Sequence, residues 1–302
     1  MSKKGKMATS LEYGAVKILL GFAAIAPRSW IYGVMHAVSS LFYHASKKRR
    51  KITIDNLEHA FPELGREEVE KLSKDVYTEL SVTASDILLM LAGRLDIDEM
   101  VINKDEALEQ FNWLKAHGGN GVIFLAAHYS NWELSALFAS RHGFPMTVIG
   151  RRGDNHLIDE RIVIPFRTRY GNQTVYKKKA GIAMLRTLKK GGMVGLLIDQ
   201  KVNKENGFLV PFFGRDAFTT HSIATLKLKA DPIIIPATML RVKPGHYRFV
   251  FGEIIAYKAE DIPDEEGKLF AMSRRYNQAL EEIIRVQPAQ WFWMHDRWNK
   301  RV

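Results

Sequence analysis

The fold of this chain is decided around the stretch GVIFLAAHYSNWELSAL, residues 121–137. An apolar run over 121–127 leads directly to a histidine, and a glutamate five positions later opens a second apolar segment. The first run is typical of a strand buried on both faces, and residues 131–141 have the apolar spacing of a helix. We therefore expect a strand, a polar turn and a helix, with His128 at the carboxyl end of the strand.

The rest of the chain continues this alternation. Further strands are expected at 146–149, 193–198, 233–236 and 247–253, with helices at 180–190 and 217–230 and a helical region over 52–94. Helices placed between apolar strands favour a parallel or mixed sheet covered on both faces. We predict an α/β fold with a central, mostly parallel or mixed sheet flanked by helices. We expect this α/β domain over 51–302 and, before it, an N-terminal extension of membrane-anchor or interfacial helices over 1–50.

The N-terminal extension contains two apolar stretches, 18–26 and 30–43, which are separated by Pro27-Arg28-Ser29 and followed by a basic run at 47–51. Neither stretch alone reaches the roughly 20 residues that a spanning helix needs. A kinked span, a hairpin and in-plane interfacial helices are all compatible with the pattern. An apolar helical layer of a soluble core is the alternative. Basic residues at both ends favour the anionic, cytoplasmic side of a membrane.

Composition excludes several kinds of site. The 302 residues include no cysteine, so disulfides, thiol nucleophiles and cysteine zinc sites are impossible. The formal net charge of +11 favours an anionic partner. A nucleic-acid binder would explain the charge, but it would explain neither the apolar N-terminus nor a histidine and a glutamate at a strand end. We expect no nucleic-acid partner.

His128 and Glu133 allow two interpretations. Ser130 and Glu133 have the spacing of a capping box, in which each side chain satisfies a backbone N–H group at a helix start. Alternatively, a carboxylate in the first helical turn can fix the tautomer of a histidine and make its other nitrogen a base. The spacing differs from the H-E-x-x-H pattern of zinc helices, so we expect no metal.

The segment HYSNWE (128–133) resembles the H-x4-D/E motif of the glycerolipid acyltransferase superfamily. Its surroundings resemble the late (secondary) acyltransferases of lipid A biosynthesis, of the lauroyl/myristoyl type. Four further blocks occur in the order of that family. They are RRKITIDNLEHAFPEL (49–64), IGRRGDNHLID (149–159), LLIDQKVNKENGFLVPFFGRDAFTT (196–220) and PAQWFWMHDRWNKR (288–301). Three departures are Glu133 where the family usually has aspartate, His156 in place of proline, and Asn299 within the terminal basic run.

The resemblance implies that His128 and Glu133 are catalytic. His128 would act as a general base oriented by Glu133, without a covalent acyl-enzyme, in a reaction that uses no cofactor. The remaining blocks supply candidate substrate-binding residues: Arg151, Arg152, Asp199, Gln200, Phe212, Phe213 and Gly214. The arginines suit phosphate oxygens. Asp199 and Gln200 would orient the acceptor or hold a loop, and residues 210–214 would form a wall of an acyl channel or simply pack in the core. The tryptophan-rich terminal block suits either a membrane interface or an aromatic core edge.

The resemblance also implies the substrates and the location. The donor would be an acyl chain held as a thioester on acyl carrier protein, and the acceptor a hydroxyl of a lipid A precursor. The enzyme would contact inner-membrane lipids, with its active site on the cytoplasmic side of the bacterial inner membrane. Another glycolipid or phospholipid acceptor, such as a phosphatidylinositol mannoside, is the alternative within the enzyme class. A non-enzymatic membrane-binding adaptor is the alternative outside it.

Overall fold

The structure is a computed structural model that describes residues 5–176 and 180–299. Its helices are α1 (Lys6–Ile25), α2 (Arg28–Ala45), α3 (Lys47–Ala60), α4 (Arg66–Leu91), α5 (Ile97–Met100), α6 (Lys104–His117), α7 (Trp132–Arg141), α8 (His156–Ile158), α9 (Ile164–Thr168), α10 (Ala180–Lys189), α11 (Ser222–Ala230) and α12 (Glu265–Val286). The π turn η1 (Asp159–Val163) and the 3-10 turns η3 (Lys204–Asn206) and η4 (Pro288–Gln290) complete the helical segments.

The strands form two sheets. They are β1 (Val122–Ala126), β2 (Met146–Gly150), β3 (Gln173–Tyr176), β4 (Met193–Leu197), β5 (Gly207–Phe212), β6 (Arg215–Thr220), β7 (Ile233–Lys243) and β8 (His246–Phe251). In the part of the chain that is described, six strands make a central sheet in the order β3-β2-β4-β1-β7-β8. Its pairs are parallel except for the antiparallel pair β7 and β8. The predicted mixed α/β fold is therefore confirmed.

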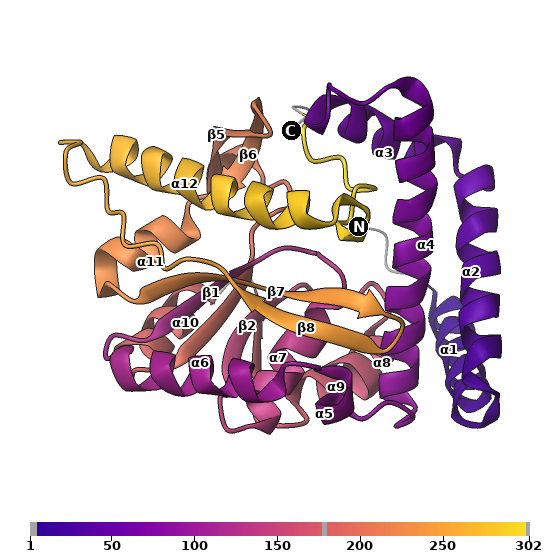
Figure 1. Ribbon diagram of the computed structural model, residues 1–302. Coiled ribbons are helices and arrows are strands. Elements are labelled where there is room, and N and C mark those ends of the chain that lie inside the picture. The colour runs from indigo at the N-terminus through magenta and orange to yellow at the C-terminus, as the bar shows by residue number, and fades with distance from the viewer. Residues whose placement is uncertain (1–4, 177–179, 300–302) are drawn as a thin grey trace.

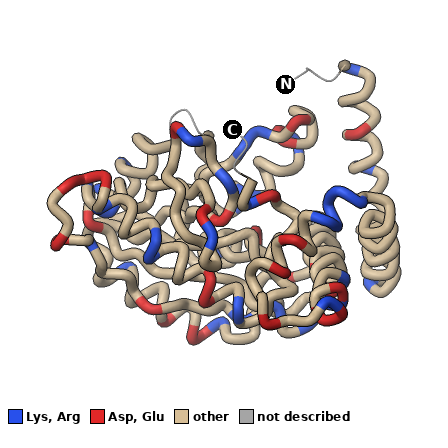
Figure 2. The backbone as a smooth tube through the Cα atoms, turned by 90° about the horizontal axis from the view of Figure 1, so that it is seen from above, with Lys and Arg blue, Asp and Glu red and all other residues tan. Residues whose placement is uncertain are grey.

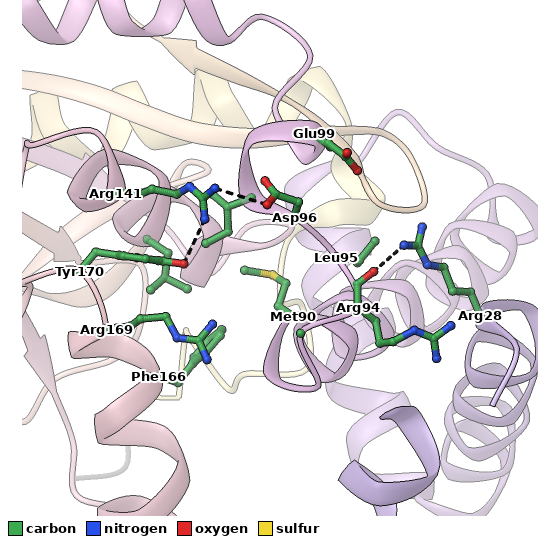
Figure 3. A pocket seen from close by; sticks show the side chains of 13 residues that line it. Arg28, Met90, Arg94, Leu95, Asp96, Glu99, Arg141, Phe166, Arg169 and Tyr170 are labelled. Atoms are coloured by element: carbon green, nitrogen blue, oxygen red, sulfur yellow. Dashed lines mark hydrogen bonds and ion pairs between the residues drawn. The ribbon is translucent and has the colours of Figure 1, made fainter. Parts of the chain in front are cut away.

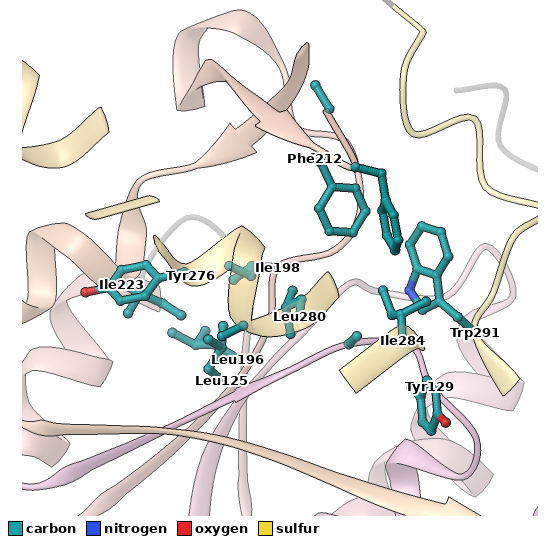
Figure 4. Close-up of a cluster of buried hydrophobic side chains, with 14 of the residues drawn as sticks. Leu125, Tyr129, Leu196, Ile198, Phe212, Ile223, Tyr276, Leu280, Ile284 and Trp291 are labelled. Atoms are coloured by element: carbon teal, nitrogen blue, oxygen red, sulfur yellow. The ribbon is translucent and has the colours of Figure 1, made fainter. Parts of the chain in front are cut away.

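Helices cover both faces of the central sheet (Figure 1). Alternate residues of β1 belong to different hydrophobic clusters, because successive side chains in a strand point to opposite faces. Ile123 and Leu125 pack with residues of α10, α11 and α12, as the close-up in Figure 4 shows for Leu125. Val122 and Phe124 pack with residues of α6 and α7. This double burial explains why β1 reads as a continuous apolar run in the sequence.

One predicted boundary is wrong. Residues 217–220 were expected to begin a helix, but they lie in β6, which pairs antiparallel with β5 in a separate hairpin. Phe213 and Gly214 form its turn with φ values of 51° and 75°. Two successive left-handed residues are what a two-residue hairpin of this kind requires. The following helix, α11, begins only at Ser222.

The N-terminal extension forms a helical layer at one side of the sheet (Figure 1). Helix α1 is long and apolar enough to cross a membrane by length and composition, and little of it is buried. Figure 2 shows that α1 and α2 carry few charged residues. Exposed apolar side chains follow one another at seven-residue spacing on α1, at Leu11, Ile18 and Ile25. An exposed apolar stripe of this kind is consistent with membrane association.

Buried polar contacts join this layer to the sheet. The Tyr32 hydroxyl of α2 donates to Asp86 of α4, and the same carboxylate accepts from Tyr247 of β8 and from the backbone N–H of Gly245. The neighbouring Arg241 of β7 is buried as well and binds Glu79 of α4. Helix α4 is therefore held by polar contacts on both its sides.

Arg241 is also held by the C-terminal segment, through the side-chain amide of Gln290. The Gln290 Oε1 atom accepts from the Arg241 backbone N–H at 3.0 Å, and its Nε2 donates to the Arg241 carbonyl at 3.0 Å. The backbone carbonyl of Gln290 accepts from Ser130 N–H at 2.8 Å, so η4 bridges β7 and the loop after β1.

We expect Gln290→Ala to lower the free energy of unfolding by at least about 2 kcal/mol, because it leaves two buried backbone groups of Arg241 unpaired. Urea denaturation in detergent measures this. The exposed Gln278→Ala on α12 is the control and should change stability by less than about 0.5 kcal/mol. Equal stability of the two variants would contradict the bridging role of Gln290.

Candidate active site

His128 lies two residues past the end of β1, in the loop that leads into α7. The C-terminal segment holds this loop from one side. The His128 carbonyl accepts from Phe292 N–H at 3.1 Å, and Tyr129 forms a β-bridge with Trp291. Ser130 has a φ of 51°, a left-handed value that turns the chain sharply before the helix. The loop is therefore fixed in an unusual conformation by its neighbours.

Asn131, rather than Ser130, caps α7: its side chain accepts from Leu134 N–H at 3.2 Å. The capping box considered for Ser130 and Glu133 does not form, and the Glu133 carboxylate binds elsewhere. It makes a two-nitrogen ion pair with Arg167 of α9, whose Nε lies 2.9 and 3.1 Å from its two oxygens.

The carboxylate that contacts His128 belongs to Asp199, which lies just past the end of β4. Asp199 Oδ1 lies 2.9 Å from His128 Nδ1, and Oδ2 accepts from the His128 backbone N–H at 2.9 Å. The Trp291 indole also donates to Oδ2, at 2.8 Å. Glu133 was expected to make this contact. Because β1 and β4 are adjacent and parallel, their carboxyl ends bring His128 and Asp199 together more directly than the helix could bring Glu133.

Burial and charge set the protonation of this pair. Burial raises the pKa of Asp199, but His128 and the N–H donors around its carboxylate lower that pKa to below its usual value. Burial lowers the pKa of His128, but Asp199 and, to a smaller extent, Glu133 raise it, so that the net pKa lies above the ordinary 6.5. Asp199 is therefore ionised, with a side chain only 1% exposed, beside an imidazole that is 23% exposed. Since Nδ1 is engaged, Nε2 is the nitrogen that a ligand can reach.

His128 lines the edge of a cavity of about 270 Å³ between α7 and the central sheet. Its charged residues, Glu133, Arg151 and Arg167, are gathered near the carboxyl ends of the strands. The cavity then continues along the strands between apolar residues such as Phe124, Met146 and Val148. Such an arrangement can take an amphipathic ligand whose reacting group stays at the polar end.

The other candidate site residues from the sequence differ in whether they line this cavity. Arg151 lines the cavity and pairs with Asp154 at 3.3 Å, whereas Arg152 lies with its guanidinium over the ring of Tyr176. Gln200 is half-buried and directly follows Asp199.

Residues 212–214 do not line the cavity of His128. Phe212 packs against Trp291 and Trp298, Phe213 packs against Trp293, and Gly214 completes the turn between β5 and β6. Their position matches the core-packing interpretation and leaves the acyl-channel interpretation without support at this place. Figure 4 shows Phe212 beside Trp291 in the core.

Three important residues were not identified as site residues from the sequence. Arg167 has no motif around it and is found only through its ion pair with Glu133. Trp291 and His295 belong to the terminal block, which was expected at a membrane interface or at an aromatic core edge. Trp291 is buried, which supports the core-edge interpretation. Burial lowers the pKa of His295 to about 4, and its Nε2 accepts from Lys201 N–H at 2.9 Å, which holds the loop after Asp199. Lys300 and Arg301 of that block lie outside the described residues.

A second cavity, of about 280 Å³, lies where α2, α4, α5, α7 and α9 meet (Figure 3). Its arginines largely serve the fold. Arg28 donates to the Arg94 carbonyl, and Arg94 donates to three carbonyls at the end of α1 and after it. Arg141 binds Asp96 and Asp98. This cavity lacks His128 and is not the candidate active site.

A parallel-stranded α/β sheet with a histidine and a carboxylate at adjacent strand ends, beside a largely apolar cavity, is an arrangement typical of a site for an amphipathic ligand. Residues 2–300 match the family described as bacterial lipid A biosynthesis acyltransferase. The chain belongs to this family, and it is thus an acyltransferase of lipid A biosynthesis.

Individual relatives are distant but match over most of their length. A lipid A biosynthesis acyltransferase of Haemophilus influenzae is 25% identical over 275 residues, which cover 88% of this chain and 83% of the relative. A lipid A biosynthesis lauroyltransferase of Escherichia coli K12 is 24% identical over 282 residues, covering 91% and 87%. A palmitoleoyltransferase of the same pathway and organism is 25% identical over 260 residues, covering 84% and 80%.

We expect Asp199→Asn to lower the pKa of His128, because the negative charge that outweighs burial is removed. Titration of the ¹⁵N-labelled imidazole by NMR measures this, with the His128 signal assigned by its loss in His128→Gln. The exposed Asp261→Asn is the control and should leave the titration unchanged. An unchanged His128 pKa in Asp199→Asn would refute the assignment of Asp199 as its partner.

Proposed function

We propose that this enzyme transfers a fatty acyl chain from a thioester on acyl carrier protein to a hydroxyl of a lipid A precursor, with His128 as the general base. The observation that carries the proposal is the pairing of His128 Nδ1 with the buried Asp199 at the polar end of an apolar cavity. Asp199 fixes the tautomer in which Nε2 is free to accept a proton. Lauroyl and myristoyl chains are the donors first to be tested.

The reaction would proceed in one direct transfer. His128 Nε2 takes the proton of the acceptor hydroxyl as its oxygen attacks the thioester carbonyl carbon. A C–O bond forms, the C–S bond breaks, and the imidazolium returns the proton to the leaving thiolate. Asp199 stabilises the imidazolium between these events. No side chain of the protein becomes acylated in this scheme, in keeping with the absence of cysteine from the sequence.

Glu133 and Arg167 serve the same step from the other side of the cavity. The Glu133 charge contributes to the raised pKa of His128 and so favours the imidazolium. Arg167 donates hydrogen bonds from Nε and Nη2 to the Glu133 carboxylate. Its third nitrogen, Nη1, makes no hydrogen bond to any residue that the structure describes. We assign this remaining nitrogen to the oxyanion that develops on the thioester carbonyl.

Arg151 is the candidate ligand of an acceptor phosphate, because it lies at the polar end of the cavity and its planar fork matches phosphate oxygens. The apolar stripe of α1 would lie in the inner membrane together with the exposed apolar side chains of α2, among them Trp30, Val34, Val38 and Leu41. The exposed basic residues that begin α3, Lys47 and Lys48 among them, would face its anionic cytoplasmic surface. Both substrates would then meet at that surface.

His128→Ala should lower kcat/KM by roughly 100-fold or more, since it removes the general base. The assay supplies purified enzyme with acyl carrier protein loaded with lauroyl or myristoyl chains, offers a lipid A precursor or a phosphatidylinositol mannoside, and weighs the products by mass spectrometry. His246→Ala, outside the cavity, is the matched control.

In the same assay, the kcat/KM of the unaltered enzyme should rise with pH through the raised pKa of His128, because the neutral imidazole is the base. Full turnover by His128→Ala would exclude the proposed chemistry. Absence of turnover by the unaltered enzyme on the lipid A precursor would reject the proposed acceptor or donor.

Glu133→Gln should lower kcat on the order of 100-fold, since it both removes a charge near the imidazolium and frees Arg167 from its position. Glu133→Asp keeps the charge on a shorter side chain, and we expect it to retain more activity than Glu133→Gln. Steady-state kinetics of the two variants test this. A near-normal kcat in Glu133→Gln would remove Glu133 from the catalytic group.

A further inference from the structure

We propose that the inner half of the active-site cavity holds the transferred acyl chain, and that Gly195 and Met146 together limit the length of chain that fits. This inference rests on the acyl transfer proposed above and deepens it by naming the residues that select the donor. We call this inner half the acyl slot and define it by Phe124, Met146, Val148 and Gly195.

The acyl slot lies on one face of the central sheet, under α7. Gly195 of β4 pairs with Val148 of β2 on one side and with Phe124 of β1 on the other. Residues paired across parallel strands point to the same face. The side chains of Val148 and Phe124 thus flank an empty position at Gly195, and the groove between them runs along the strands.

The lack of a side chain at Gly195 makes room for this groove. A Cβ atom built on Gly195 would lie 3.3 Å from Cγ1 of Val148 and 3.7 Å from Sδ of Met146, and both of these side chains line the slot. Any side chain at position 195 would therefore project into the cavity. The backbone of Gly195 is not in the left-handed region, so its conformation does not require glycine. Already at 3.3 Å a Cβ atom would press on Val148, so close packing beside the cavity accounts for glycine here.

Met146 marks the inner end of the slot. It is the first residue of β2, whereas Gly150, which also lines the cavity, is the last. The four steps between them correspond to about 13 Å along the strand. At this inner end the Asn172 side chain accepts from Met146 N–H at 2.8 Å and donates to the Ala136 carbonyl of α7 at 2.9 Å. These bonds fix the distance between β2 and α7 where the slot ends.

The chemistry of the slot suits a hydrocarbon chain. The charged residues of the cavity lie at the end where His128 would meet the acceptor, and the four defining residues of the slot are apolar. Asn172, the polar residue at the inner end, has its side-chain amide bonded to Met146 and Ala136. A chain that extends from a thioester carbonyl beside His128 toward Met146 would place its methyl end against Met146. Relatives named for lauroyl and for palmitoleoyl transfer match this chain about equally, so similarity alone does not select a chain length.

The test measures chain-length preference in two variants expected to change it in opposite directions. Gly195→Val adds volume inside the slot, and Met146→Ala removes volume at its inner end. If Gly195→Val does not fold, Gly195→Ala replaces it. Val194→Ala is the matched control, because Val194 is the next residue of β4 and its side chain packs on the opposite face.

Two readouts are needed. The first is calorimetric binding of saturated fatty acids from octanoate to stearate, which requires no acceptor. The second is the distribution of transferred chains when a mixture of acyl carrier protein thioesters is supplied with the lipid A precursor.

We expect the preferred chain to be shorter in Gly195→Val and longer in Met146→Ala, and unchanged in the control. Each methylene that no longer fits should lower affinity about fourfold. A shifted binding preference without acylation of the precursor would uphold the slot and reject the acceptor. Continued transfer with one chain-length distribution in all variants would overturn the slot while leaving the proposed function intact. Failure of any fatty acid to bind the unaltered protein would overturn the slot as well.

Discussion

The site depends on one buried carboxylate. Asp199 receives three hydrogen bonds, from the backbone and the ring of His128 and from the indole of Trp291. These donors come from the loop after β1 and from the C-terminal segment, while Asp199 itself follows β4. A buried charge is tolerated only when donors surround it. The same contacts that stabilise Asp199 therefore bring three distant parts of the chain together and fix the imidazole among them.

The C-terminal segment does more than fill the core. Trp291 donates to Asp199, His295 accepts from the loop after it, and Gln290 joins the loop of His128 to β7. Farther along, the buried guanidinium of Arg297 donates to Phe218 and Thr219 of β6, and burial lowers its pKa to about 10. Gln290, Trp291 and His295 thus position loops at the carboxyl ends of the central sheet, and Arg297 holds the β5–β6 hairpin.

The sequence predicts the fold better than it predicts the site. A continuous apolar strand followed by a polar residue places His128 at a strand end, because local pattern carries that information. The partner of His128 depends on the order of the strands in the sheet, which sequence spacing does not reveal. The spacing suggests Glu133, but the partner is Asp199, because β1 and β4 are adjacent. Arg167 could not be found from the sequence for the same reason, since its only signal is an ion pair formed across the cavity. The strand over 215–220 was missed because its turn uses Phe213 in a conformation that usually calls for glycine or asparagine.

The bond between Tyr32 and Asp86 has a consequence for how substrates approach. Through Asp86, helix α2 is tied to the β7–β8 edge of the sheet, so the N-terminal helices cannot tilt independently of the catalytic body. With those helices embedded in a bilayer, the imidazole would be held at a constant height relative to the lipid headgroups. The enzyme would then select among the hydroxyls of a large glycolipid by their distance from the membrane surface. Only a hydroxyl at the height of the imidazole could react.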